Sequence, residues 1–182
     1  MWGVFETERL RLEPLRESHA GELFDLLSDP RLYEFIPQDP PATREALAAR
    51  YRFLESRHSP SGDEAWLNWA VRSKEGGACV GTVQVTVASD RRAQLAYEIG
   101  VPFWRRGLAT EACARVIRAL FEEGIVEVRA ELDTRNVASI RLLERLGFTR
   151  GGLRRNADRF KGADSDEWTY TLRSPARRPP VS

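Results

Sequence analysis

Cysteine and histidine are scarce in this 182-residue sequence, which contains two of each. Two cysteines supply neither a disulfide framework nor a metal-ligand cluster, so we expect Cys79 and Cys113 to be small core residues within apolar runs. Neither histidine has an acidic residue or a cysteine patterned around it. The sequence therefore predicts no metal site and gives no indication of a covalent intermediate on a thiol.

Long apolar runs are also absent. No stretch approaches the length of a membrane span, and residues 1–9 lack the apolar core of a signal peptide. The formal net charge is only +1, so no overall electrostatic field favours nucleic acid or an anionic membrane as a partner. Lys74 and Lys161 are the only lysines among 28 basic residues, a bias that we attribute to overall composition. These absences predict a cytoplasmic protein that binds neither nucleic acid nor membrane.

The length and a hydrophobic content of 42% suit one domain, placed at residues 1–173 before a disordered tail rich in proline and arginine at 174–182. Hydrophobic periodicity predicts strands at 8–15, 66–73, 80–88, 93–101, 126–132, 148–153 and 168–172. It predicts helices at 18–27, 43–57, 107–123 and 136–146, and a loop is expected at 154–165. This order predicts an α+β domain with a mixed, mostly antiparallel sheet of about seven strands flanked by helices. The crossover helix at 107–123 should make the strands on either side of it parallel.

The turn between the strand at 93–101 and the helix at 107–123 carries two arginines and a glycine. The first N–H groups of a helix have no partner within it, and the helix dipole places partial positive charge at that end. Gly107 lacks a Cβ, so a ligand can approach the backbone closely there. We expect this turn to bind phosphate, with the side chains of Arg105 and Arg106 available for its oxygens. The alternative is that Gly107 only shapes a tight turn and that the two arginines are solvated.

The segment RGLATEA at 106–112, after EIG at 98–100, resembles the acetyl-CoA pyrophosphate loop of the GNAT superfamily of N-acetyltransferases. That loop usually reads Gln/Arg-x-x-Gly-x-Gly/Ala. Gly107 and Ala109 meet its last two positions, whereas Trp104 departs from the first, as an aromatic residue often does in the RimJ/RimL-like branch. Further stretches that resemble this branch in order and spacing lie at 7–12, 66–71, 77–83, 136–139, 146–148 and 154–172.

The resemblance implies a single GNAT-type domain in which two parallel strands splay apart and hold acetyl-CoA in the gap. The backbone at the end of the first of these strands would pair with the pantetheine arm, and one of its N–H groups would polarise the thioester carbonyl. The cofactor-binding residues implied in this way are Ile99, Gly100, Val101, Arg105, Arg106, Gly107, Leu108, Ala109, Thr110, Asn136 and Ser139. A local helix cap is the alternative role for Asn136.

Two residues are candidates for the chemistry of acetyl transfer. At pH 7 about 10% of a protein α-amine is neutral but only about 0.04% of a lysine amine, so the acceptor decides how much a base is needed. Glu98 is our candidate base, provided that burial raises its pKa, and a surface or acceptor-positioning carboxylate is the alternative. Ser139 is our candidate hydrogen-bond donor to the departing thiolate, because its helix lacks the tyrosine that many superfamily members carry there.

The acceptor site is the least certain part of the sequence-based prediction. We expect Tyr33, Phe35, Trp69 and Glu98 to contact the acceptor, with ordinary core packing as the alternative for the aromatic residues. The predicted function is transfer of an acetyl group from acetyl-CoA to a protein N-terminal α-amine or a small amine, by direct attack in a ternary complex. An acyl-CoA-binding sensor or partner module without transfer activity is the alternative, and the oligomeric state, a homodimer included, stays open. A dinucleotide-binding domain is excluded because the turn around Gly107 lacks the G-x-G-x-x-G spacing.

Overall fold

The computed structural model describes residues 2–175, so most of the tail expected at 174–182 lies outside the described part of the chain. Within residues 2–175 there are eight strands, namely β1 (Phe5–Glu6), β2 (Leu10–Pro14), β3 (Glu64–Ser73), β4 (Cys79–Ala88), β5 (Arg92–Ile99), β6 (Glu127–Asp133), β7 (Thr149–Phe160) and β8 (Ala163–Arg173). The four α-helices of the same part are α1 (Ala20–Leu27), α2 (Arg44–Leu54), α3 (Leu108–Glu122) and α4 (Val137–Arg145). None of these helices is long and apolar enough to cross a membrane.

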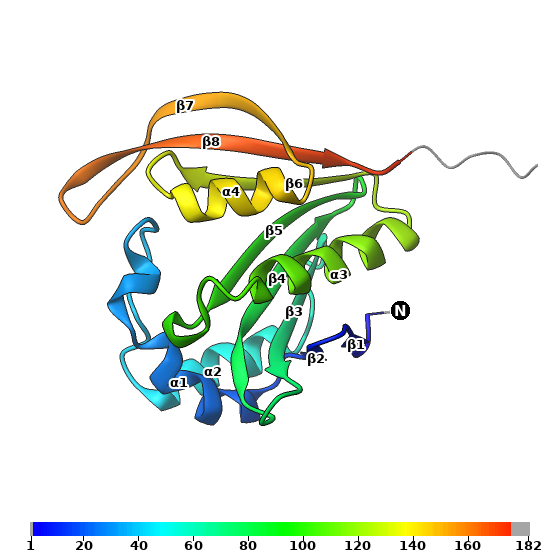
Figure 1. Ribbon diagram of the computed structural model, residues 1–182, viewed down its shortest axis with the longest axis vertical. Coiled ribbons are helices and arrows are strands. Elements are labelled where there is room, and N and C mark those ends of the chain that lie inside the picture. Colours follow the sequence, from blue (N-terminus) through cyan, green and yellow to red (C-terminus); the bar gives the residue numbers. More distant parts are fainter. Residues whose placement is uncertain (1, 176–182) are drawn as a thin grey trace, which may run out of the picture.

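All eight strands form one sheet in the order β1-β2-β3-β4-β5-β6-β8-β7. Neighbouring strands are antiparallel except for β5 and β6, which are parallel. Figure 1 shows α3 and α4 side by side across the sheet. The predicted α+β domain with a mixed sheet is therefore confirmed. The additional strand, β1, has only two residues, too few for an alternating pattern to reveal it.

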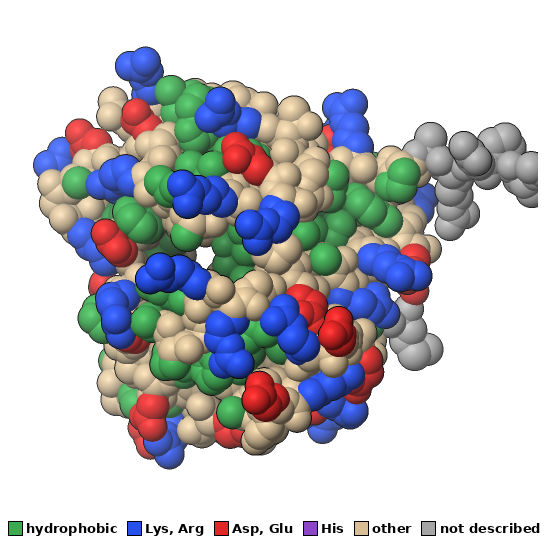
Figure 2. Space-filling view, in the orientation of Figure 1, with side chains coloured by type: hydrophobic (Ala, Val, Ile, Leu, Met, Phe, Trp, Pro, Cys, Tyr) green, Lys and Arg blue, Asp and Glu red, His purple; other side chains and the backbone are tan. Residues whose placement is uncertain are grey.

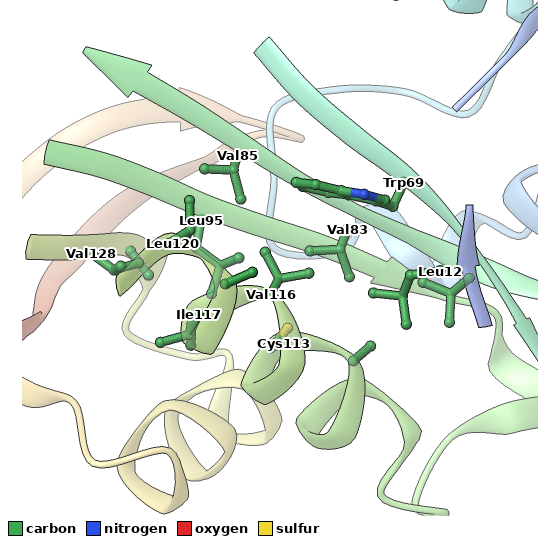
Figure 3. Packing of buried hydrophobic residues seen from close by; sticks show 14 of the residues in the cluster. Leu12, Trp69, Val83, Val85, Leu95, Cys113, Val116, Ile117, Leu120 and Val128 are labelled. Carbon is green, nitrogen blue, oxygen red and sulfur yellow. The ribbon is translucent and has the colours of Figure 1, made fainter. Parts of the chain in front are cut away.

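The apolar core lies on both faces of the sheet because successive side chains of a strand point to opposite faces. In β3, Trp69 joins the larger apolar cluster beneath α3, whereas Ala70 joins the smaller cluster beneath α1 and α2. Figure 3 shows Val116 of α3 meeting Val83 and Leu95 of the central strands in the larger cluster. Both cysteines are buried and free, in agreement with their expected role in the core.

The parallel strands β5 and β6 stay together for only a short distance. Their paired residues are Arg92 with Glu127, Ala93 with Val128 and Gln94 with Arg129. β6 then continues alongside β8 up to Asp133, so the second half of β5 has no partner strand on that side. This divergence leaves backbone groups of β5 unpaired where the strand approaches the start of α3.

The closing pair of strands is longer than expected. The prediction of a loop at 154–165 is wrong, because β7 and β8 form a long hairpin that turns at Lys161 and Gly162, with irregular pairing between Arg150 and Leu153 and between Arg154 and Asp158. The segment is rich in arginine and aspartate and has no apolar alternation, so its pattern does not indicate a strand. Cross-strand contacts such as the ion pair between Arg159 and Asp164, at 2.8 Å, accompany the pairing. Charged side chains are usual on such an edge strand because they discourage pairing with other chains.

One helix start also differs from the prediction. Ser18 does not begin a helix but lies inside a 3₁₀ turn at Glu17–His19, and α1 begins at Ala20 without a side-chain cap. The helix predicted to start at residue 43 begins as expected, because the side chain of Thr43 accepts a hydrogen bond from the N–H of Ala46 at 3.1 Å.

Gly81 of β4 allows the C-terminal end of β5 to approach closely. It pairs with Ile99, and a Cβ at this position would lie 2.0 Å from the carbonyl oxygen of Glu98. We therefore expect Gly81→Ala to lower the free energy of unfolding by about 1–3 kcal/mol, because the backbone must move to relieve the clash. Urea denaturation measures this change. Gly152→Ala is the matched control, since nothing lies within 4 Å of its added Cβ; equal losses in the two variants would contradict the prediction.

Candidate active site

The N-terminus of α3 presents free backbone donors. Gly107 is the residue before the helix and has a left-handed backbone with φ of 76°. The first hydrogen bond of the helix runs from the N–H of Glu111 to the carbonyl of Gly107 at 3.1 Å. The N–H groups of Leu108, Ala109 and Thr110 precede that bond and are directed out of the helix end, where the dipole is positive. This arrangement is suited to binding an anionic group such as phosphate.

Two residues of the β1–β2 connection hold this turn in place. The hydroxyl of Thr7 donates to Glu111 at 2.6 Å, and Nε of Arg9 donates to the other oxygen of the same carboxylate at 2.7 Å. Nη1 of Arg9 also donates to the carbonyl of Arg106 at 2.9 Å. Burial by itself raises the pKa of Glu111, but the hydrogen bonds from Thr7 and Arg9 outweigh it and hold that pKa below its ordinary value. No role was expected for these three residues, although two of them lie in the 7–12 stretch of the resemblance and Glu111 lies in the 106–112 stretch.

The two arginines of the turn are exposed, so their guanidinium groups are accessible to a ligand. Arg106 lies 5.8 Å from the ring centroid of Phe103 and 3.5 Å from a carboxylate oxygen of Glu75, an exposed and long ion pair. Such a pair contributes little to stability and gives way readily to a stronger anion. Figure 2 shows a small opening through the molecule, with a lysine or arginine side chain at one edge and hydrophobic side chains beside it.

Trp104 departs from the usual loop pattern, and the structure gives it a local role. Its indole Nε1 donates a hydrogen bond of 2.6 Å to the carbonyl of Ile99. The N–H of the same tryptophan donates to the carbonyl of Val101 at 3.2 Å, within the 3₁₀ turn Val101–Phe103. Trp104 therefore fastens the turn that contains Gly107 to the end of β5.

The free edge of β5 can be assigned from its two ends. Just before β5, the carbonyl of Arg91 accepts a hydrogen bond from the N–H of Val126, so it faces the edge next to β6. Just after β5, the N–H of Gly100 donates to the carbonyl of Val80, so it faces the edge next to β4. Successive residues of a strand direct their backbone groups to opposite edges. The N–H groups of Tyr97 and Ile99 therefore face the gap between β5 and β6.

Gly100 has a different role from the one expected for it. Its N–H is already bonded to β4, so it is not a free donor toward the gap. A Cβ at this position would lie 2.0 Å from Cδ1 of Leu26, so glycine is required here by the close packing of α1. Of the two neighbouring residues Ile99 and Gly100, Ile99 is the one whose N–H faces the gap.

The start of α4 lies across the gap from this edge. Oδ1 of Asn136 accepts a hydrogen bond from the N–H of Ser139 at 3.1 Å, so the asparagine is the helix cap. The cap is braced by the buried carboxylate of Asp133, which accepts hydrogen bonds from Nε of Arg135 at 2.8 Å and from the hydroxyl of Ser165 at 2.8 Å. Hydrogen bonding to Arg135 lowers the pKa of Asp133. The turn that carries Asn136 and Ser139 is therefore tied to β8.

Glu98 lines a cavity of about 180 Å³ on the opposite face of the sheet, beneath α1 and α2. The walls are mostly apolar and include Leu15, Leu47 and Leu54. The hydroxyl of Thr82 lies 3.4 Å from the carboxylate of Glu98, a long contact. Burial raises the pKa of Glu98, and the charge of Arg50 and the contact with Thr82 only partly oppose this effect. A raised pKa is what a role as a base requires of this carboxyl group, and the role itself stays a prediction.

Two tyrosines complete the cavity wall. Tyr33 lies there as expected, and its hydroxyl donates to the carbonyl of Leu27 at 2.8 Å. Tyr51 is only 4% exposed, and among the described residues its hydroxyl has no hydrogen-bond partner. Burial is the main cause that raises the pKa of both phenols, and the nearby Glu98 carboxyl raises them further. The structure thus leaves the hydroxyl of Tyr51 available to an occupant of the cavity.

The other two aromatic residues predicted for acceptor contact lie elsewhere. Trp69 is fully buried on the α3 face, where its indole donates to the carbonyl of Gly3 at 3.0 Å, so we leave it out of the acceptor site. Phe35 does not line the cavity but lies 6.0 Å from the guanidinium of Arg135, beside the turn before α4. The segment around Phe35 is also held by Lys161, whose Nζ donates to the carbonyl of Ile36 at 2.8 Å.

The amino-acid sequence matches the acetyltransferase (GNAT) domain over residues 9–149. The chain belongs to the GNAT family. It is 24% identical over 178 residues to an uncharacterised N-acetyltransferase, YoaA, of Bacillus subtilis, and the match covers 96% of this chain and 99% of YoaA.

Solved structures of acetyltransferases share the fold of this GNAT domain. The ribosomal-protein-S5-alanine acetyltransferase of Vibrio fischeri superimposes with a TM-score of 0.82 at 20% identity, covering 97% of this chain and 99% of the other. A RimL ribosomal L7/L12 α-N-protein acetyltransferase in complex with coenzyme A has a TM-score of 0.82 at 17% identity, covering 93% and 97%. The GNAT family consists of N-acetyltransferases that use acetyl-CoA, so this chain is an acetyl-CoA-dependent enzyme of that class.

The residues of this GNAT domain fit acetyl-CoA. The left-handed Gly107 and the three free N–H groups after it suit the diphosphate, and two exposed arginines stand beside them. The unpaired edge of β5, with the N–H of Ile99 facing the gap, suits an extended arm that pairs like an added strand. Among residues 2–175 there is no group of histidine, cysteine, aspartate and glutamate side chains that could hold a metal ion.

Proposed function

We propose that this enzyme transfers the acetyl group directly to a primary amine bound in the Glu98 cavity, and that the amine is a protein N-terminal α-amine or a small molecule. The observation that carries the proposal is the position of a carboxyl group with a raised pKa in a small cavity next to the free edge of β5. A cavity of about 180 Å³ is smaller than the roughly 300 Å³ or more of a drug-sized site. It suits one amino-acid residue or a small amine. The α-amine is favoured by the names of the two ribosomal-protein acetyltransferases that share the fold.

In the proposed reaction each residue has a separate task. Bound acetyl-CoA supplies a thioester, and the N–H of Ile99 faces the gap where it can polarise the carbonyl oxygen. Glu98 takes a proton from the acceptor, directly or through a water, and so keeps the amine nitrogen nucleophilic. The N–H groups of Leu108 to Thr110, with Arg105 and Arg106, hold the diphosphate. Asn136 fixes the start of α4, from which Ser139 donates a hydrogen bond to the leaving sulfur.

A thiol-release assay with acetyl-CoA tests this proposal. The acceptors are short peptides with free N-termini, the same peptides with blocked N-termini and internal lysines, and a set of small primary amines. We expect release with free α-amines or small amines, and mass spectrometry should find one acetyl group on the nitrogen. Binding of acetyl-CoA by calorimetry without release on any amine would instead support an acyl-CoA-binding module.

The free hydroxyl of Tyr51 gives a prediction about acceptor binding. Tyr51→Phe should raise the KM for the acceptor about threefold to tenfold, because one hydrogen bond between protein and ligand is worth about 0.5–1.5 kcal/mol. The KM for acetyl-CoA should stay unchanged. Removing a buried hydroxyl that lacks a partner should also leave the protein as stable as before or more so, which thermal unfolding measures. Tyr170→Phe is the control, since that buried tyrosine lies outside the cavity lining. An unchanged acceptor KM in Tyr51→Phe would remove this hydroxyl from the acceptor site.

A further inference from the structure

A tyrosine from β5 meets the serine at the start of α4. The hydroxyl of Tyr97 donates a hydrogen bond of 2.9 Å to Oγ of Ser139. Tyr97 and Glu98 are consecutive, so their side chains leave opposite faces of the sheet. The contact therefore spans the two elements that border the gap, on the face away from the Glu98 cavity. Nothing in the local sequence around either residue indicates that they meet, because they are 42 positions apart.

The direction of this hydrogen bond leaves the serine proton free. Oγ of Ser139 accepts from Tyr97, and the backbone N–H of Ser139 is already bound to Asn136. A serine hydroxyl has one hydrogen to donate, and accepting a hydrogen bond makes it a better donor. The hydroxyl of Ser139 therefore keeps its own hydrogen for a further acceptor, and the hydrogen bond from Tyr97 makes it a better donor.

Tyr97 keeps its proton at neutral pH. Burial raises the pKa of its phenol to about 12, although the hydrogen bond to Ser139 has the opposite effect. An ordinary thiol has a pKa of about 8.5, more than three units lower, so a thiolate does not remove the proton from this phenol. Tyr97 is therefore suited to hold and polarise Ser139 rather than to serve as an acid itself.

We propose that Tyr97 is a positioning residue that aims the Ser139 hydroxyl at the leaving sulfur of coenzyme A. The inference rests on the proposed function. When the amine nitrogen bonds to the carbonyl carbon, the C–S bond breaks and its electron pair passes to sulfur. The nitrogen loses its proton to Glu98, and solvent later supplies the proton that converts the thiolate to the thiol. Ser139, held by Tyr97, stabilises the developing negative charge on sulfur by a hydrogen bond between these two events.

The kinetic test uses Tyr97→Phe, which keeps the buried ring and removes only the hydroxyl. We expect kcat to fall about tenfold, the loss that corresponds to about 1.4 kcal/mol of transition-state stabilisation. The KM for acetyl-CoA should change less than twofold. Ser139→Ala should lose more, and the double variant should equal Ser139→Ala, because Tyr97 acts only through the serine. Tyr170→Phe, which removes a buried tyrosine hydroxyl elsewhere in the sheet, is the control and should keep the wild-type kcat.

A second measurement does not depend on turnover. The pKa of the thiol of bound coenzyme A is followed by the ultraviolet absorbance of the thiolate as pH is varied. It should be lowest in the wild type and should rise in both Tyr97→Phe and Ser139→Ala, since each variant weakens the hydrogen bond to the sulfur. An unchanged thiol pKa, or equal losses of kcat from Tyr97→Phe with and without Ser139, would show that the contact only joins β5 to α4. If the wild type shows no turnover but the thiol pKa still rises in the two variants, the proposed function alone is overturned. Failure to bind coenzyme A would overturn both the proposed function and this inference.

Discussion

Glu98→Gln is expected to lower kcat at pH 7 by about 10²–10³-fold, within the range that a general base contributes. Glutamine fills the same space in the cavity but cannot accept the proton of the amine. The loss should be smaller at pH 9 for an α-amine acceptor, because an amine with a pKa near 8 is then mostly neutral without help. Initial rates at both pH values, with saturating acetyl-CoA, measure the difference.

The same substitution has an expected effect on stability that separates chemistry from folding. Burial raises the pKa of Glu98, so the folded protein binds this proton more tightly than the unfolded chain does. The contribution of Glu98 to the stability of the fold is therefore most favourable at a pH below its pKa in the unfolded chain. It becomes unfavourable as pH rises through its pKa in the folded protein. Glu98→Gln removes that cost, so the melting temperature at pH 7 should stay equal or increase while the activity falls.

The control for this prediction is Glu131→Gln, which changes a more exposed carboxylate on the neighbouring strand β6. Its kcat should match the wild type at both pH values. If Glu98→Gln loses the same factor at pH 7 and pH 9, the carboxylate positions the acceptor and does not act as a base. If the variant retains full activity at both, Glu98 has no role in the reaction.

Gly107→Val is expected to weaken the binding of coenzyme A by more than tenfold. A β-branched residue at a φ of 76° is strained by about 1–3 kcal/mol, and it also places methyl groups beside the free N–H groups at the start of α3. Both effects act on the backbone that we propose as the binding site of the diphosphate. Isothermal titration calorimetry with coenzyme A measures the affinity without any need for an acceptor.

A matched control removes strain as the explanation. Gly62 has a nearly identical φ of 78° in an open loop, and nothing lies within 4 Å of a Cβ added there. Gly62→Val should therefore share the cost in stability but keep the affinity for coenzyme A. An affinity of Gly107→Val equal to that of the control would remove this turn from the cofactor site and leave the proposed function without its cofactor contact.

Part of the site could be predicted because it depends on short stretches of sequence. The strand at 93–101, the turn at Gly107 and the helix that follows form one local unit, and alternation along the strand separates Glu98 from its neighbours. The cap formed by Asn136 and Ser139 is also local, since the two residues are three positions apart. These elements follow from hydrophobic periodicity, from glycine geometry and from the unpaired N–H groups of a helix end.

The acceptor side was predicted less well, for a physical reason. Aromatic residues are large and apolar, and the sequence does not say whether such a residue fills the core or lines a cavity. Trp69 and Tyr51 illustrate this: the first is sealed in the core beneath α3, whereas the second lines the cavity with an unpartnered hydroxyl. The difference depends on which face of the sheet each helix covers, and no local pattern records that.

The α+β fold class, the glycine turn before α3, the alternation that singles out Glu98 and the start of α4 could all be read from short stretches of sequence, because neighbouring residues specify each of them. Contacts between distant side chains became visible only in the folded chain. Arg9 braces the turn through Glu111, 102 positions away, and Tyr97 reaches Ser139 across the gap between β5 and α4. Such contacts depend on the order of strands in the sheet and on the divergence of β5 from β6, which arise only when the whole chain packs around its core.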